Sequence, residues 1–161
     1  MSEEVKFHLG VKAIIRNEHG KILLLKIRPD TLLGYSGSAY WDVPGGRIQW
    51  DSVIRDESRG QVEWESSILA TLAREIEEET GLIMSGSVTP FSFVISNVSY
   101  PVRGGEIVGL ILRSYLFPIS DVKEIILSGE HSEYGWFAPL EASNLLEVKF
   151  PREFCDCIAS L

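Results

Sequence analysis

Cysteine, long apolar runs and basic residues are all scarce in this sequence. Its only two cysteines, Cys155 and Cys157, are separated by one residue, which is too tight for an ordinary disulfide, and two ligands do not make a zinc site. We therefore expect two reduced thiols on a final helix. No apolar stretch reaches membrane-spanning length, and the first residues lack the apolar core of a signal peptide. A cytoplasmic protein without a membrane partner is expected.

Charge excludes another class of partner. The chain has 15 Lys and Arg against 23 Asp and Glu, which leaves a net charge of −8. Binding to a nucleic-acid polymer requires a basic face, so an acidic chain is a poor candidate for it. A local polyanion can still bind where a metal cation carries the positive charge. The charge therefore favours a small-molecule ligand over a nucleic acid.

The length of 161 residues predicts one domain, 1–161, able to bury a core without disulfides or a structural metal. Apolar patterning predicts strands, then a helix, then strands, then helices, which is typical of mixed α/β packing with helices on both sides of a sheet. The predicted strands are 11–16, 21–27, 90–96 and 105–119, with a short one after 130. The late helices are predicted to begin near Pro139 and at 151. A long loop rich in Gly, Pro, Ser and Tyr is predicted over 28–46.

The central helix is predicted from Ser66 or Ser67 to Thr80. Either serine can serve as the N-cap, and Gly81 stands where a helix-ending glycine belongs. Helical spacing gives this helix a core-facing side. That side consists of Leu69, Leu72, Ala73, Ile76 and Thr80.

The last turns of that helix carry the chemistry, in the stretch "REIEEETG". Glu75, Glu78 and Glu79 are spaced i, i+3 and i+4, so their carboxylates share one face, whereas Glu77 points elsewhere. Three clustered carboxylates repel one another, and Arg74 alone cannot neutralise them. A solvated acidic face is the simpler reading of such a run taken alone. A hard divalent cation such as Mg²⁺, which takes carboxylate oxygens, water and phosphate, is the alternative.

Two further features favour the metal. Gly81 ends the helix at the expected position, two residues after Glu79. Upstream, "WDVPGG" ends in a rigid backbone corner at Pro44-Gly45-Gly46. Together, Gly-Gly followed by Arg-Glu-apolar-x-Glu-Glu-x-Gly-apolar resembles the Nudix box, whose second half is matched from Arg74 to Leu82 at every fixed position. "NEHGKILLLK" and "EHSEYGWFAPLE" are similar to other family segments, so the resemblance spans nearly the whole chain.

The resemblance implies a Nudix-type α/β/α sandwich with a mixed β-sheet. It also implies metal-dependent hydrolysis of the pyrophosphate linkage in a nucleoside diphosphate derivative, with Mg²⁺ or Mn²⁺, and a possible homodimer. Carried onto this sequence, Glu78 and Glu79 are the main metal ligands, and Glu75 is a further ligand or orients a water. Arg74 positions a neighbouring carboxylate, and Gly46 lets a backbone carbonyl approach the metal.

The first half of the box departs from the family pattern. Roughly 13 extra residues lie between Gly46 and the helix, and "RIQW" and "QVEW" hint at an inserted hairpin within about 47–65. Either Glu65 takes the place of the first box glutamate with the helix one residue longer, or Ser66 replaces that acid. We expect Glu65 to lie near the site without assigning it as a ligand.

Other candidates come from the loops. Family members often recruit a late-loop acid as base or extra ligand, and Glu130 ranks before Glu133 for that role. Arg47 is the arginine best placed to contact phosphate, and Tyr100 resembles a marker of the dinucleoside-polyphosphate branch. His131 is expected to be solvent-exposed rather than catalytic. The aromatic residues that could stack on a base are Tyr35, Tyr40, Trp41, Trp50 and Trp64.

Two other functions compete with the hydrolase. A catalytically weak nucleotide-sensing Nudix domain is motivated by the broken first half of the box. An isoprenoid diphosphate isomerase of the Nudix type wants a cysteine in the cleft, and here both cysteines lie far toward the C-terminal end.

Overall fold

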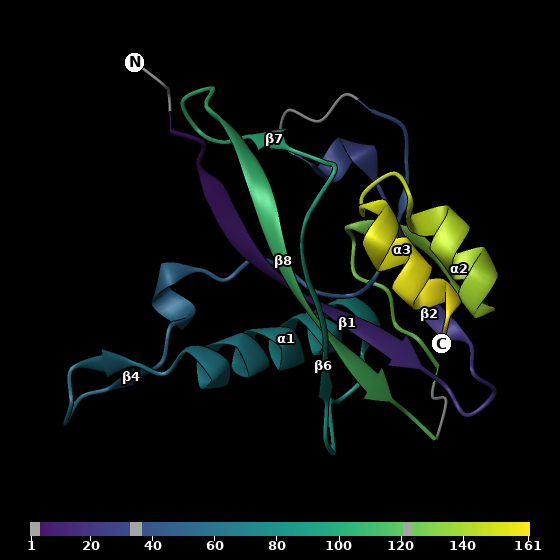
Figure 1. Cartoon of the computed structure of the whole chain (residues 1–161), viewed down its shortest axis with the longest axis horizontal. Coiled ribbons are helices and arrows are strands. Elements are labelled where there is room, and N and C mark those ends of the chain that lie inside the picture. Colours follow the sequence, from purple (N-terminus) through teal and green to yellow (C-terminus); the bar gives the residue numbers. More distant parts are fainter. Residues whose placement is uncertain (1–3, 33–36, 121–123) are drawn as a thin grey trace.

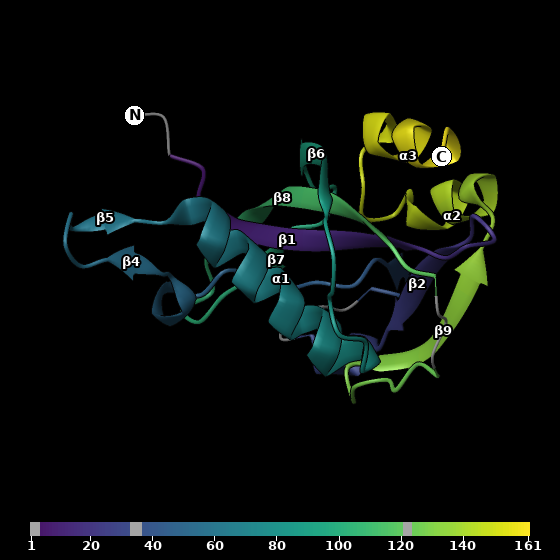
Figure 2. The same ribbon diagram turned by 90° about the horizontal axis from the view of Figure 1, so that it is seen from below.

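The computed structural model describes residues 4–32, 37–120 and 124–161. In this part of the chain, seven strands form one mixed sheet with helices on both faces, as Figures 1 and 2 show. This confirms the predicted α/β class. The strands of the sheet are β1 (Phe7–Arg16), β2 (Ile22–Ile27), β3 (Trp41–Asp42), β6 (Thr89–Ile95), β7 (Tyr100–Pro101), β8 (Ile107–Pro118) and β9 (His131–Phe137).

Three helices cover the two faces in Figure 2: α1 (Trp64–Thr80) lies on one side of the sheet, and α2 (Pro139–Leu146) with α3 (Arg152–Ala159) lies on the other. Under α1, Leu72 and Ile76 pack against β1 and β8. On the opposite face, Leu146 and Phe154 pack with apolar residues that point the other way from the same strands. Because side chains alternate along a strand, β1 supplies both cores and is buried on both faces.

The sheet parts between β1 and β2, and this parting positions the site. Strand β1 runs parallel to β8 over its whole length, from the pair Phe7↔Gly109 to the pair Arg16↔Pro118. It pairs with β2 only at Arg16↔Ile22, next to their turn. Farther along, β2 pairs with β3, and β1 receives the chain that follows β3: Val11 donates to the Gly46 carbonyl and Ala13 to the Pro44 carbonyl, both at 2.8 Å. The Pro44–Gly46 corner therefore sits in the opening.

Helix α1 begins earlier than predicted. Its first residue is Trp64 and its N-cap is Glu63, so the expectation that Ser66 or Ser67 caps it was wrong. Ser67 lies inside the helix, where its hydroxyl accepts a hydrogen bond from the Ile54 amide at 2.9 Å. The other end is as predicted: Gly81 terminates the helix with φ 70°, a left-handed conformation that glycine adopts without strain.

Residues 50–63 form an arm that projects from the body of the protein, at the left of both figures. Its outer part is a small antiparallel hairpin of β4 (Arg55–Asp56) and β5 (Gln61–Val62). The hairpin differs from the one that the sequence hinted at: "QVEW" contains its second strand, whereas "RIQW" forms neither strand and ends at the first residue of a short 3-10 helix, Trp50–Ser52. That this region is an insertion stays a prediction. Within the described residues no helix is long and apolar enough to cross a membrane.

Candidate active site

A cleft of about 690 Å³ opens on the side of the sheet away from most of α1, beside the parting of β1 and β2. The predicted residues Gly46, Arg47, Glu75, Glu79, Tyr100 and Glu130 all line it. Arg74 and Glu78, also predicted, do not line the cleft. The structure therefore brings together six of the eight predicted residues and leaves one arginine and one glutamate on the outer surface of α1.

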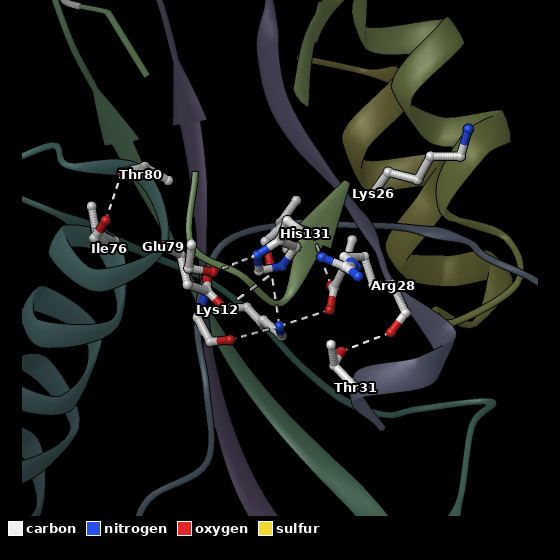
Figure 3. A network of polar contacts seen from close by, with 12 residues as sticks. Lys12, Lys26, Arg28, Thr31, Ile76, Glu79, Thr80 and His131 are labelled. Carbon is white, nitrogen blue, oxygen red and sulfur yellow. Dashed lines mark hydrogen bonds and ion pairs between the residues drawn. The ribbon is translucent and has the colours of Figure 1, made fainter. Parts of the chain in front are cut away.

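Glu79 is the most enclosed of the glutamates. Its side chain is 10% exposed, and one carboxylate oxygen accepts a hydrogen bond from the Gly45 amide at 2.7 Å. The other oxygen lies 3.8 Å from Nε2 of His131 (Figure 3). Burial raises the pKa of Glu79 to about 7, although Lys12 and the Gly45 amide lower it. An enclosed carboxylate that is costly to ionise gains from a cation placed beside it.

Glu75 meets the glycine corner directly. A Cβ added to Gly46 would lie only 2.3–2.5 Å from the three carboxyl atoms of Glu75, so no larger residue fits there without moving that side chain. The Glu75 side chain is 15% exposed and accepts a hydrogen bond from Arg74 at 2.6 Å. The Gly46 carbonyl, predicted to approach a metal, accepts the Val11 amide. Close packing of helix and corner thus explains the glycine at position 46.

Glu78 lies outside this enclosure. Its side chain is 56% exposed and accepts a hydrogen bond from Arg74 at 2.7 Å, one helical turn away. Arg74 thus bridges Glu75 and Glu78, and its role in positioning a carboxylate for catalysis stays a prediction.

A buried charge network at the floor of the cleft was missed by sequence reasoning. Asp42 accepts hydrogen bonds from the ammonium groups of both Lys12 and Lys149. Burial alone would raise the pKa of Asp42, but the two lysines outweigh it and hold that pKa below its usual value. Lys12 had a signal, since it interrupts the apolar strand "VKAIIR"; Lys149, which follows α2, had none.

His131 is buried, so the expectation of a solvent-exposed loop histidine was wrong. It begins β9, and its Nδ1 lies 3.1 Å from the Ser128 hydroxyl. Burial, with a smaller contribution from Lys12, lowers the pKa of His131 to about 4, so the ring is neutral near pH 7. Figure 3 shows His131 and Lys12 on the same side of Glu79.

The two neighbouring loop acids, Glu130 and Glu133, lie in different surroundings. Glu130 lines the cleft, while Glu133 is exposed on β9 and pairs with Lys26 at 3.3 Å. Glu65, expected near the site, instead accepts a hydrogen bond from the Tyr115 hydroxyl at 2.9 Å and does not line the cleft. Ser66 is an exposed residue of the first turn of α1.

Arg47 and Tyr100 form one unit on the cleft wall. The Arg47 guanidinium donates to the Tyr100 hydroxyl at 3.1 Å and lies 4.9 Å from the centre of its ring. Among the other aromatic candidates, Tyr40 lines the cleft, and Trp41 packs edge-on against Phe137. Trp50 and Trp64 are exposed at the two ends of the arm. Tyr35 lies outside the described residues.

The side chains of the cleft offer oxygen donors to a divalent metal. Within the described residues, no three acidic, histidine or cysteine side chains stand close enough together to hold an ion. Two carboxylates, from Glu75 and Glu79, do share the cleft. Mg²⁺ commonly takes one or two protein carboxylates and completes its shell with water and substrate phosphates. The hard oxygen donors therefore fit this class of ion, while Glu78 is paired with Arg74 outside the cleft.

Comparison with known proteins identifies the family. The NUDIX domain matches residues 6–156, so the chain belongs to the Nudix family and is a Nudix hydrolase. This family acts on nucleoside diphosphate derivatives, and its hydrolases generally use divalent metals. No curated protein matches the sequence.

Solved structures agree with this fold. The MutT protein from Methanosarcina mazei Go1 is 27% identical, with 99% of this chain and 95% of that one covered and a TM-score of 0.64. The E. coli dihydroneopterin triphosphate pyrophosphohydrolase is 13% identical, with 98% and 97% covered and a TM-score of 0.62. A C. elegans Ap4A hydrolase is 15% identical, with 95% and 96% covered and a TM-score of 0.56. The last two likenesses concern the fold alone.

Proposed function

We propose that this chain hydrolyses the pyrophosphate linkage of a nucleoside diphosphate derivative with Mg²⁺ or Mn²⁺ in the cleft. The observation that carries the proposal is the convergence of two largely buried carboxylates, Glu75 and Glu79, on the Gly45–Gly46 corner at the cleft wall. Basic side chains line the same cleft, so an acidic protein still offers a local site for a polyanion.

The side chains divide the work in this proposal. Glu75 and Glu79 hold the metal from inside the cleft, and Glu78 joins them when its carboxylate leaves Arg74. When bound, the ion polarises a phosphoryl oxygen and lowers the pKa of a water. Arg47, already turned to the cleft wall, donates to a phosphate. Glu130, which directly precedes β9, accepts the proton of the attacking water.

The test is a substrate screen with matched variants. Purified protein with Mg²⁺ is offered nucleoside triphosphates, dinucleoside polyphosphates, ADP-ribose and other nucleotide sugars, with phosphate, pyrophosphate and nucleotide products quantified. Glu78→Gln and Glu79→Gln are each expected to lower kcat by about a hundredfold or more, because each removes an anionic ligand. Glu77→Gln is the control, because Glu77 is an exposed residue of the same helix outside the cleft. Full activity in both Glu78→Gln and Glu79→Gln would contradict the proposal.

A second candidate is a nucleotide sensor with little catalysis. It is favoured by the lack of any three-ligand metal cluster within the described residues. Tight nucleotide binding with no turnover of any substrate, with Mn²⁺ as well as Mg²⁺, would select it over the hydrolase.

A further inference from the structure

The two buried lysines at the floor of the cleft share Asp42, but their ammonium groups are not equally satisfied. Lys12 donates to the Asp42 carboxylate at 2.8 Å, to the Val43 carbonyl at 3.1 Å and to the Gly45 carbonyl at 2.9 Å. A lysine ammonium has three N–H donors. Lys12 therefore has no donor left for a ligand, and its role is to hold the corner of the loop.

Lys149 keeps spare donors. Among the described residues, Asp42 is the one hydrogen-bond acceptor of its ammonium group. The aromatic rings of Tyr40 and Phe150 each lie 5.9 Å from the nitrogen and offer it no lone pair. The side chain is 8% exposed, yet it lines the cleft. Two N–H donors thus remain on a buried cation that lines the cleft.

The surroundings of this cation suit a flat ring better than a phosphate. Tyr40, whose ring lies 5.9 Å from the ammonium nitrogen, lines the same cleft, as do the apolar side chains of Ile27, Leu110 and Leu112. Pockets of this composition orient planar ligands by apolar contact, and a few placed polar groups decide which ligand fits. The glutamates, Arg47 and Arg103 also line the cleft and can serve the metal and the phosphates, which leaves Lys149 for the base.

Donor chemistry then separates two classes of base. A 6-oxopurine presents two adjacent acceptors, O6 and N7, to an ammonium group, whereas adenine presents an amino donor beside N7. A donor opposite an ammonium leaves buried donors unpaired, which is costly. We propose that Lys149 is a specificity-determining residue that selects nucleotides with a 6-oxopurine base over those with a 6-aminopurine base. The inference rests on the proposed function, because it names the substrate class of the same cleft.

The test uses ligands that differ mainly at position 6. Binding of inosine diphosphate and adenosine diphosphate is measured by calorimetry without metal, and hydrolysis of the two triphosphates is measured with Mg²⁺. The wild-type protein is expected to bind the inosine ligand about ten- to a hundredfold more tightly. Lys149→Met should weaken inosine binding by that factor and leave adenosine binding unchanged.

Two further variants keep the test sharp. In Lys149→Met the Asp42 carboxylate keeps Lys12 as its counter-ion. Thermal unfolding of the variant checks that the fold is retained. Lys149→Arg restores a donor and should recover part of the preference. Lys21→Met removes an exposed positive charge outside the cleft and controls for net charge.

The same measurements separate the base preference from the hydrolytic activity. Equal affinity for the two diphosphates, no binding of either, or an equal loss for both in Lys149→Met would overturn it. A base preference that depends on Lys149 without hydrolysis of any nucleotide would support it while rejecting the hydrolase. Hydrolysis of the two triphosphates without a base preference would support the hydrolase and overturn the role of Lys149.

Discussion

Two ion clusters of this protein have similar chemistry and opposite surroundings. Arg74 bridges Glu75, which lines the cleft, to Glu78 on the outer surface of α1, and the Arg74 and Glu78 side chains are 42% and 56% exposed. At the floor of the cleft, Asp42 is shared by Lys12 and Lys149, and all three side chains are nearly enclosed. Exposed pairs contribute little to stability, whereas removing one partner of a buried pair is costly. The outer cluster can therefore rearrange around a ligand, while the inner one is a fixed framework.

Breaking the inner cluster should have the largest effect. Asp42→Asn leaves two buried ammonium groups without a counter-ion and is expected to lower the free energy of unfolding by about 3–5 kcal/mol. Urea denaturation of the two proteins near pH 7 measures this difference. Wild-type stability in the variant would mean that the network is better solvated than its burial indicates.

The same pair of proteins has a defined pH dependence. The folded pKa of Asp42 is lowered from 3.8, so its contribution is fully present above that unfolded value and is lost as pH falls through the folded pKa. The stability gap between wild type and Asp42→Asn should therefore persist at neutral pH and narrow only in strongly acidic solution. A gap that closes near neutral pH would contradict this assignment.

An intermediate effect is expected where helix and glycine corner touch. Gly46→Ala places a Cβ against the Glu75 carboxyl, so that side chain must move. Misplacing a catalytic group by about 1 Å costs up to about a hundredfold in rate, and we expect a ten- to hundredfold loss of kcat. Gly129→Ala is the matched control, because a Cβ there meets nothing within 4 Å. Equal rates in the two variants would mean that Glu75 tolerates displacement.

The smallest effect is expected at Glu65, an exposed acid at the start of α1. Glu65→Gln keeps an acceptor for the Tyr115 hydroxyl, so stability should stay within about 0.5 kcal/mol and activity should be unchanged. Steady-state kinetics and thermal unfolding measure both. A tenfold loss of activity would indicate that Glu65 acts in the site. It would favour the alignment in which Glu65, rather than Ser66, takes the place of the first box glutamate.

Local patterns predicted much of this fold. Apolar periodicity located β2, β6, β8 and the late helices, and Gly81 marked the end of α1, because these features depend on neighbours along the chain. It placed the start of β1 four residues too late, and it missed β3 inside the predicted loop 28–46. The start of α1 was misplaced because serine is a common N-cap, whereas here Ser67 accepts a bond from the Ile54 amide in the arm. That contact depends on the arm packing against the start of α1, and the N-cap preference of a residue type does not predict such packing.

The site was predictable where one helix supplies it. Spacing alone placed Glu75, Glu78 and Glu79 on one side of α1, but it could not tell that Glu79 would be enclosed and Glu78 exposed. That difference arises from the Gly45 corner and His131, which come from elsewhere in the chain. The Lys12–Asp42–Lys149 network joins three distant segments and depends on tertiary packing in the same way.

The parting of β1 and β2 also constrains how the protein folds. The corner that fills the opening is held by β1, and β1 is held by β8, whose paired residues are roughly 100 positions later in the chain. Such pairing has high contact order and is slow to form. We therefore expect native activity to return only with the last structural phase of refolding, so that enzyme turnover reports completion of the whole sheet.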